Sequence, residues 1–160
     1  MSNLYRKYSP LKIIVTGHSL GGALATLGAY DLRLKFGGKV WMINFASPRV
    51  GNSRFAHSFN ELFRDRSFRI TRGNDIVPTI PPRALGFHHV GREVWYSGSS
   101  LSYKVCGHDG EDLKCYLRKK LGNLLKTPIA VCKLISTVRS IKEHTNYLGF
   151  STSCDSGGLA

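Results

Sequence analysis

The spacing of apolar and polar residues divides the first hundred positions into alternating strand and helix segments. A β-branched run, Leu11 to Val15, predicts a fully buried strand, and the Ala- and Leu-rich run over residues 20–36 predicts a helix. The pattern then predicts a strand over 39–46, a short helix over 53–63 capped by Asn52, a strand over 67–72 and a strand over 93–97. Residues 1–10 fit the polar end of a helix and a turn. This alternation predicts an α/β protein with a mostly parallel sheet and helices on both faces.

Length and composition fit a single domain over residues 1–160. Of the 160 residues, 42% are hydrophobic, which is enough for a sizeable core. The formal net charge is +13, from 23 Lys and Arg against 10 Asp and Glu, and such a balance can favour anionic partners. We expect no nucleic-acid partner, because no common nucleic-acid module is apparent and the basic stretch 113–142 has one aromatic residue, Tyr116, too few for base stacking.

The most informative motif joins the first expected strand to the first expected helix. Residues 17–21, Gly-His-Ser-Leu-Gly, have the Gly-x-Ser-x-Gly spacing of a nucleophile elbow, a tight turn that presents Ser19 at the positive end of a helix. Side chains two residues to either side of the serine would collide, so we expect Gly17 and Gly21 to be required. The five residues alone also fit a loop in which Ser19 caps the helix, but the flanking strand and helix favour the elbow.

A serine hydroxyl needs a base to act as a nucleophile at neutral pH, and the base needs an orienting acid. Asp75 follows the third expected strand, at the sheet edge where reactive residues gather, although Gly-Asn-Asp also fits an ordinary turn. In the order serine, acid, histidine the base follows the acid along the chain, so only the four histidines after Asp75 are candidate bases: His88, His89, His108 and His144. Order and context favour His144, although a single histidine is often structural.

Several separated segments together resemble the class 3 triacylglycerol lipases, the fungal lipase-like group of the α/β-hydrolase fold. The matching pieces are Ile-Val-Thr-Gly-His-Ser-Leu-Gly-Gly-Ala-Leu-Ala at 14–25, Phe-Ala-Ser-Pro-Arg-Val-Gly-Asn at 45–52, Arg-Gly-Asn-Asp-Ile-Val-Pro-Thr-Ile-Pro-Pro at 72–82, His-Val-Gly-Arg-Glu-Val-Trp-Tyr at 89–96 and Glu-His-Thr-Asn-Tyr-Leu-Gly at 143–149. Matches that keep their order over most of a chain are far more specific than any single motif.

The resemblance implies Ser19 as nucleophile, Asp75 as acid and His144 as base. It implies hydrolysis of carboxylic esters, typically acylglycerols at a lipid–water surface, through an acyl-enzyme. The backbone N–H of Leu20 is the expected oxyanion donor. The resemblance also implies secretion, although no signal-peptide pattern follows Met1 in this sequence.

The four cysteines allow three full pairings, which the sequence does not resolve. Cys106 and Cys115 match a disulfide loop of the family, so the resemblance favours that pair and leaves Cys132 and Cys154 without assigned partners. No Cys-x-x-Cys spacing indicates zinc or redox chemistry, and we expect neither a metal nor a cofactor.

Two features depart from the family. The chain begins one short helix before the nucleophile strand, so we interpret it as the C-terminal half of a lipase, apparently truncated at the N-terminus. Such a half lacks the second oxyanion donor and the lid, and it leaves one edge of the nucleophile strand unpaired. The stretch 113–142 is atypically basic, and its two apolar series fit either surface helices packed on the core or an interfacial helix that contacts an anionic membrane. The alternative to an esterase is therefore a catalytically inert fragment or lipid-surface interaction module.

Overall fold

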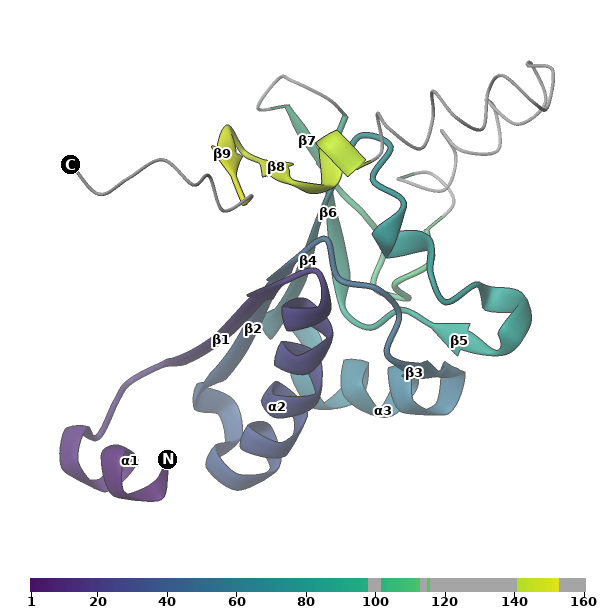
Figure 1. Ribbon diagram of the computed structural model, residues 1–160. Helices are drawn as coiled ribbons and strands as arrows, with labels where there is room; N and C mark the ends of the chain where they lie inside the picture. The colour runs from purple at the N-terminus through teal and green to yellow at the C-terminus, as the bar shows by residue number, and fades with distance from the viewer. Residues whose placement is uncertain (98–101, 113–114, 116–140, 153–160) are drawn as a thin grey trace, which may run out of the picture.

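The computed structural model describes residues 1–97, 102–112, 115 and 141–152 (Figure 1). Their elements are, in chain order, α1 (Ser2–Tyr8), β1 (Ile13–His18), α2 (Leu20–Phe36), η1 (Gly37–Lys39), β2 (Val40–Phe45), β3 (Gly51–Asn52), α3 (Ser53–Phe63), η2 (Arg64–Arg66), β4 (Ser67–Arg72), η3 (Val77–Thr79), η4 (Arg83–Leu85), β5 (Phe87–His88), β6 (Arg92–Tyr96), β7 (Tyr103–Val105), β8 (Asn146–Tyr147) and β9 (Phe150–Ser151). No helix in these ranges is both long and apolar enough to cross a membrane.

A five-stranded sheet in the order β1-β2-β4-β6-β7 organises the described residues. The first four strands run parallel, and β7 joins β6 antiparallel at the edge. The small antiparallel pairs β3–β5 and β8–β9 lie outside this sheet. Parallel strands end at the same edge, so the loops that follow β1 and β4 emerge together. The β8–β9 hairpin, yellow in Figure 1, crosses this same edge.

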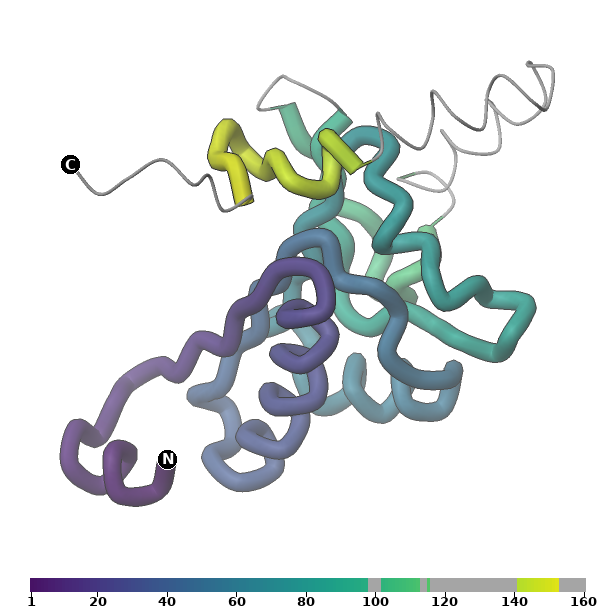
Figure 2. The backbone as a smooth tube through the Cα atoms, viewed as in Figure 1, coloured from purple at the N-terminus to yellow at the C-terminus, as the bar shows by residue number. Residues whose placement is uncertain are grey.

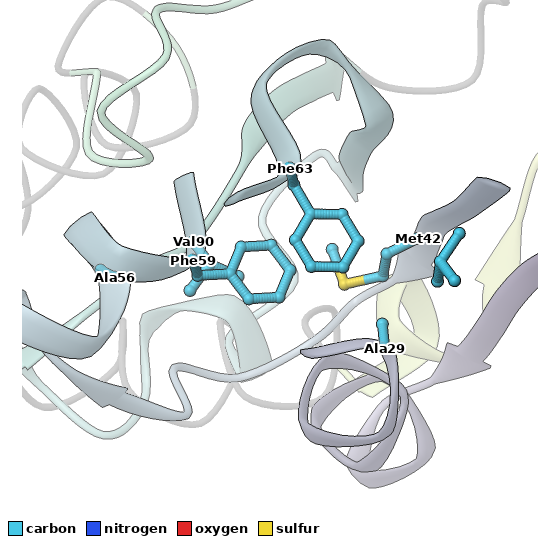
Figure 3. Packing of buried hydrophobic residues seen from close by; sticks show 7 residues of the cluster. Ala29, Met42, Ala56, Phe59, Phe63 and Val90 are labelled. Carbon is cyan, nitrogen blue, oxygen red and sulfur yellow. The ribbon is translucent and has the colours of Figure 1, made fainter. Parts of the chain in front are cut away.

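The main core lies between the sheet and the helices α2 and α3. Alternate residues of β2 are buried, and Met42 packs with Ala29 of α2 and with Phe59 and Phe63 of α3 (Figure 3). The two phenylalanine rings stack with centroids 4.2 Å apart. Both long helices in the described ranges therefore cover one face of the sheet, whereas the sequence pattern predicted helices on both faces.

The sequence pattern located most of these elements. The helices over 20–36 and 53–63 and the strand over 67–72 have the expected bounds, and the expected Asn52 cap accepts a hydrogen bond from the backbone N–H of Phe55 at 2.9 Å. The second expected strand is one residue shorter at each end, and the fourth begins and ends one residue earlier than expected. The three-residue strand β7 was not expected, because its Tyr-Lys-Val run is too short to show a period.

The prediction of a fully buried first strand is wrong. The strand covers Ile13–His18, so it begins two residues and ends three residues later than expected, and Leu11 before it is 93% exposed. Within the strand, Ile14 is still 55% exposed, because β1 is the edge strand of the described sheet and this side chain points away from α2. The expected unpaired edge of the nucleophile strand is thus present in the described residues. Most of the stretch 113–142, together with Cys132 and Cys154, lies outside these ranges.

A buried ion pair fixes the loop that follows β4. The Arg49 guanidinium donates from Nε to Glu111 Oε1 at 2.7 Å and from Nη2 to Oε2 at 2.9 Å, and each side chain is 2% exposed. Its Nη1 donates to the carbonyl oxygens of Thr79 at 2.6 Å and Pro81 at 3.1 Å. The Glu111 carboxylate also accepts from the backbone N–H of His89 at 2.9 Å. Three separate loops are therefore held together by one buried pair.

The lowered pKa of Glu111 makes the stability that this ion pair contributes depend on pH. Burial raises the pKa of Glu111, but the hydrogen bonds from Arg49 and from the backbone of His89, together with the positive charges of Arg49 and Arg69, outweigh burial, so its pKa lies below the ordinary value of 4.5. A carboxyl group with a lower pKa in the native state stabilises the fold above its unfolded-state pKa. That stabilisation is lost as the pH falls through the native pKa.

We expect Glu111→Gln to lower the free energy of unfolding by about 3–5 kcal/mol at pH 7, because the substitution leaves the buried Arg49 charge without its partner. The difference from wild type should shrink as the pH falls below 4.5, where the wild-type carboxyl also becomes neutral. Urea unfolding at a series of pH values measures this difference. Glu61→Gln, at an exposed position of α3, is the matched control and should change little. A difference that does not vary with pH would contradict the ion-pair explanation.

Candidate active site

Ser19 occupies the tight turn between β1 and α2. Its backbone has φ 56° and ψ −126°, a conformation that non-glycine residues rarely adopt. The Ser19 N–H donates to the carbonyl of Phe45 on β2 at 3.0 Å, and its own carbonyl accepts from the N–H of Gly22 at 2.9 Å. The strained residue is therefore held from both sides, with its hydroxyl at the N-terminal end of α2.

Two glycines make this turn sterically feasible, but they are not the two that the motif spacing predicts. A Cβ atom on Gly17 would lie 2.2 Å from the backbone oxygen of Gly21, and one on Gly22 would lie 2.9 Å from the Cβ of Ser47. A Cβ on Gly21 would meet nothing within 4 Å. The expectation for Gly17 agrees with the geometry and that for Gly21 is wrong, because α2 approaches the sheet through Gly22.

The ring of His144 bridges the other two predicted residues. Its Nε2 lies 2.9 Å from Ser19 Oγ, and its Nδ1 lies 3.0 Å from both carboxylate oxygens of Asp75. Ser19 and His144 are separated by 125 positions in the chain. In this arrangement Nδ1–H donates to the carboxylate, which leaves Nε2 as the acceptor for the serine hydroxyl.

Asp75 is completely buried, and its carboxylate is satisfied by donors from its own loop and from the C-terminal segment. Oδ1 accepts from the backbone N–H of Val77 at 3.0 Å, and Oδ2 accepts from the hydroxyl of Tyr147 at 2.5 Å. Tyr147 is itself buried, and its ring packs edge-on against Phe45 of β2 with centroids 6.4 Å apart. The acid is thus oriented by fixed groups on both oxygens.

Polar contacts dock the segment that carries His144 onto the end of β4. The Arg72 guanidinium donates to the backbone carbonyl of Asn146 and, at 3.0 Å, to its side-chain oxygen. The carboxylate of Glu143 accepts from the backbone N–H of Asn74 in the loop before Asp75. Figure 2 shows the yellow C-terminal segment crossing above the turn between β1 and α2.

These docking residues were missed in the sequence, although a signal existed. Glu143 and Tyr147 both lie in the segment Glu-His-Thr-Asn-Tyr-Leu-Gly that carries the family resemblance. Tyr147 follows His144 by three positions and forms the antiparallel pair β8–β9 with Phe150. The contacts of both residues are with positions about seventy residues earlier in the chain, so only the folded chain assigns them to this site.

The alternative histidines have other contacts. His89 is buried, and its Nε2 donates to the carbonyl of Pro78 at 2.6 Å. Burial lowers the pKa of His89 well below the ordinary 6.5, and the nearby Arg69 and Arg49 charges lower it further. His108 is exposed beside Arg92, and His88 belongs to β5. The structure brings none of these three rings to Ser19 through any hydrogen bond described.

Two further predictions concern Leu20 and the cysteines. Leu20 is the first residue of α2, a position whose N–H has no acceptor within the helix.

Cys106 and Cys115 form a disulfide with their Cα atoms 6.2 Å apart. Their sulfurs and the Glu93 carboxylate lie within 4.8 Å of one another, but sulfurs joined in a disulfide are not thiolate ligands for a metal.

A parallel sheet, a strained serine between strand and helix, a buried acid and a histidine between them are typical of the α/β-hydrolases. The family model described as Lipase (class 3) matches residues 1–85. A lipase of Rhizomucor miehei is 33% identical over 156 residues, which cover 92% of this chain and 38% of that protein. A secreted mono- and diacylglycerol lipase of Malassezia globosa is 42% identical over 96 residues, 59% of this chain and 32% of that protein.

Solved structures agree with the sequence comparisons. Lipase II from Rhizopus niveus superposes with a TM-score of 0.76 and 28% identity over 94% of this chain and 52% of its own. A triacylglycerol lipase whose catalytic centre is formed by a serine protease triad superposes with a TM-score of 0.74 and 32% identity, also over 94% of this chain and 52% of its own. The chain therefore belongs to the class 3 lipase family and has its α/β-hydrolase fold. It spans about half the length of these structures and less of the curated relatives.

We expect Gly17→Ala and Gly21→Ala to differ sharply. The new methyl group of Gly17→Ala meets backbone atoms, so the free energy of unfolding should fall by about 1–3 kcal/mol or more. Gly21→Ala places the methyl in open space within a helix and should be neutral or stabilising by up to about 1 kcal/mol. Urea unfolding of the two variants measures both effects. Equal losses of stability would contradict the steric assignment.

We expect Tyr147→Phe to lower the free energy of unfolding by about 1.5–3 kcal/mol, because the buried Asp75 carboxylate loses a donor to a charged group. Tyr103→Phe, at a tyrosine that is 63% exposed, is the matched control and should leave stability unchanged. Chemical denaturation gives both values. A Tyr147→Phe variant as stable as the control would show that the hydroxyl does not support the carboxylate.

Proposed function

We propose that this chain carries the catalytic centre of a serine ester hydrolase that acts on lipid esters. The observation that supports the proposal most directly is the position of the His144 ring, within hydrogen-bond distance of Ser19 Oγ and of both Asp75 oxygens. Nucleophile, base and acid in such contact form the arrangement that activates a serine hydroxyl.

In the proposed acylation step, Ser19 Oγ attacks the carbonyl carbon of the ester while His144 Nε2 accepts the hydroxyl proton. Asp75 keeps the proton of the ring on Nδ1 and stabilises the positive charge that the ring acquires. The backbone N–H of Leu20 donates to the oxyanion, aided by the positive end of α2. His144 then gives its proton to the leaving alcohol, and the acyl group remains on Ser19.

Water completes the proposed cycle. His144 Nε2 removes a proton from a water molecule as the water oxygen adds to the acyl carbon. The proton returns to Ser19 Oγ when the bond between that oxygen and the acyl carbon breaks. The products are a free carboxylic acid and the regenerated serine hydroxyl.

Acylglycerols are the substrate class that we favour. The relatives named above include mono- and diacylglycerol lipases and a triacylglycerol lipase. Apolar side chains next to the catalytic residues are exposed, with Leu20 at 68% and Ile76 at 42%, which suits contact with an acyl chain. We also propose a secreted protein that meets its substrate at a lipid–water interface, since relatives are named as secreted and a disulfide is typical of oxidising compartments.

We expect a fluorophosphonate probe to label Ser19 in the 160-residue chain, because phosphonylation needs the activated hydroxyl rather than a complete acyl-binding groove. Ser19→Ala should abolish labelling, and His144→Ala should slow it by about 10⁴-fold, the effect typical of removing a triad member. Ser53→Ala, at an exposed serine that begins α3, is the matched control and should be labelled like wild type.

Mass spectrometry of the labelled peptide identifies the modified residue. Hydrolysis of mono- and diacylglycerols, compared with that of phospholipids in the same assay, tests the substrate class. Labelling of Ser19→Ala at the wild-type rate would refute the proposed nucleophile. Folded protein without any labelling of Ser19 would instead favour an inert lipid-surface module.

A further inference from the structure

The residue before Ser19 makes a contact with the base that the catalytic scheme does not use. His18 is the last residue of β1, and its Nε2 lies 2.9 Å from the backbone carbonyl oxygen of His144. A carbonyl oxygen only accepts hydrogen bonds, so Nε2 of His18 must carry the proton and donate it. Two adjacent residues, the last of β1 and the first of the turn after it, thus hold the base twice, His18 at its main chain and Ser19 at its ring.

The surroundings of His18 favour its neutral form. Burial lowers the pKa of His18 below the ordinary 6.5, and its nearness to His144 lowers it further, whereas the hydrogen bond to the carbonyl and the Asp75 charge raise it. The rings of His18 and His144 have centroids 4.7 Å apart, and the Tyr147 ring packs edge-on against His18 at 5.5 Å. A neutral His18 in this position does not oppose the positive charge that His144 carries during catalysis.

The hydrogen bonds of His144 with Ser19 and with His18 behave differently during a reaction cycle. In the acyl-enzyme, Ser19 Oγ is an ester oxygen and has no proton to donate, so its hydrogen bond to His144 Nε2 is absent. The base must nevertheless stay in place to activate the incoming water. The bond from His18 to the carbonyl involves no reacting atom and persists through both halves of the cycle.

We propose that His18 is a positioning residue that anchors the main chain of the base His144 and keeps it in place while Ser19 is acylated. The inference rests on the proposed function. It assigns His18 a role mainly in deacylation, because only in that half of the cycle does the base lack its bond to the serine.

Burst kinetics with p-nitrophenyl acetate separate the two steps, since the burst rate reports acylation and the steady-state rate reports deacylation. His18→Leu removes the donor, and we expect it to slow deacylation about tenfold while acylation changes less than about threefold. His18→Gln retains an amide N–H at similar reach and should restore deacylation to within about threefold of wild type. His57→Leu, at an exposed histidine of α3, is the control for the substitution itself.

A role in general stability would slow both steps equally, and Gln would then offer no specific rescue. Either result overturns the proposal, as does a His18→Leu variant with unchanged rates. His18→Asn, whose amide is too short to reach the carbonyl, replaces His18→Leu if that variant does not fold, and it should show the same selective loss. Labelling that depends on Ser19 while the His18 variants behave like wild type would refute this inference and leave the proposed function standing.

A measurement without turnover tests the contact itself. Long-range proton–nitrogen NMR correlations at pH 8 distinguish the two neutral tautomers of a histidine ring. We expect His18 to be protonated at Nε2 in the full chain, with or without an active serine. Protonation at Nδ1 would make the bond to the His144 carbonyl impossible and would overturn the proposal even if no esterase activity were found.

Discussion

The buried carboxylate of Asp75 imposes the strongest constraint on this site. A carboxylate without exposure to water is costly unless donors replace its hydration. Here Val77 supplies a backbone N–H from the same loop, and His144 and Tyr147 supply side-chain donors from a segment about seventy residues later in the chain. The C-terminal segment must therefore dock before the acid is satisfied, and docking also carries the His144 ring to Ser19.

The nucleophile side depends on close backbone packing instead of on charge. Gly17 and Gly22 let α2 begin within contact distance of β1 and of Ser47, and this approach forces Ser19 into its strained conformation. The two sides of the site are built by different physics, since steric exclusion fixes the serine and hydrogen bonding to a buried charge fixes the acid and base.

Local patterns in the sequence predicted the helices α2 and α3 and the strand β4, and the family resemblance added to them the residues that meet around His144. Periodicity carries the information on the elements, because it depends on residues close together in the chain. The order of the motifs and the family resemblance carry the information on Ser19, Asp75 and His144, which lie far apart in the sequence. The exposure of Ile14 was not predictable, since burial of a strand depends on its neighbours in the sheet. The roles of Gly22, Glu111 and Tyr147 were missed for the same reason, because each acts on a residue distant in sequence.

The long separation between Ser19 and His144 has a consequence for biosynthesis. At roughly 5–20 residues per second, a ribosome adds His144 about 6–25 s after Ser19. Throughout that interval the strand and helix of the elbow can form, but the serine has no base and Asp75 has no C-terminal donors. A nascent chain thus exposes a hydroxyl of ordinary reactivity. If the proposed chemistry is correct, the order of the residues along the chain delays esterase activity until nearly all of the described fold has been synthesised.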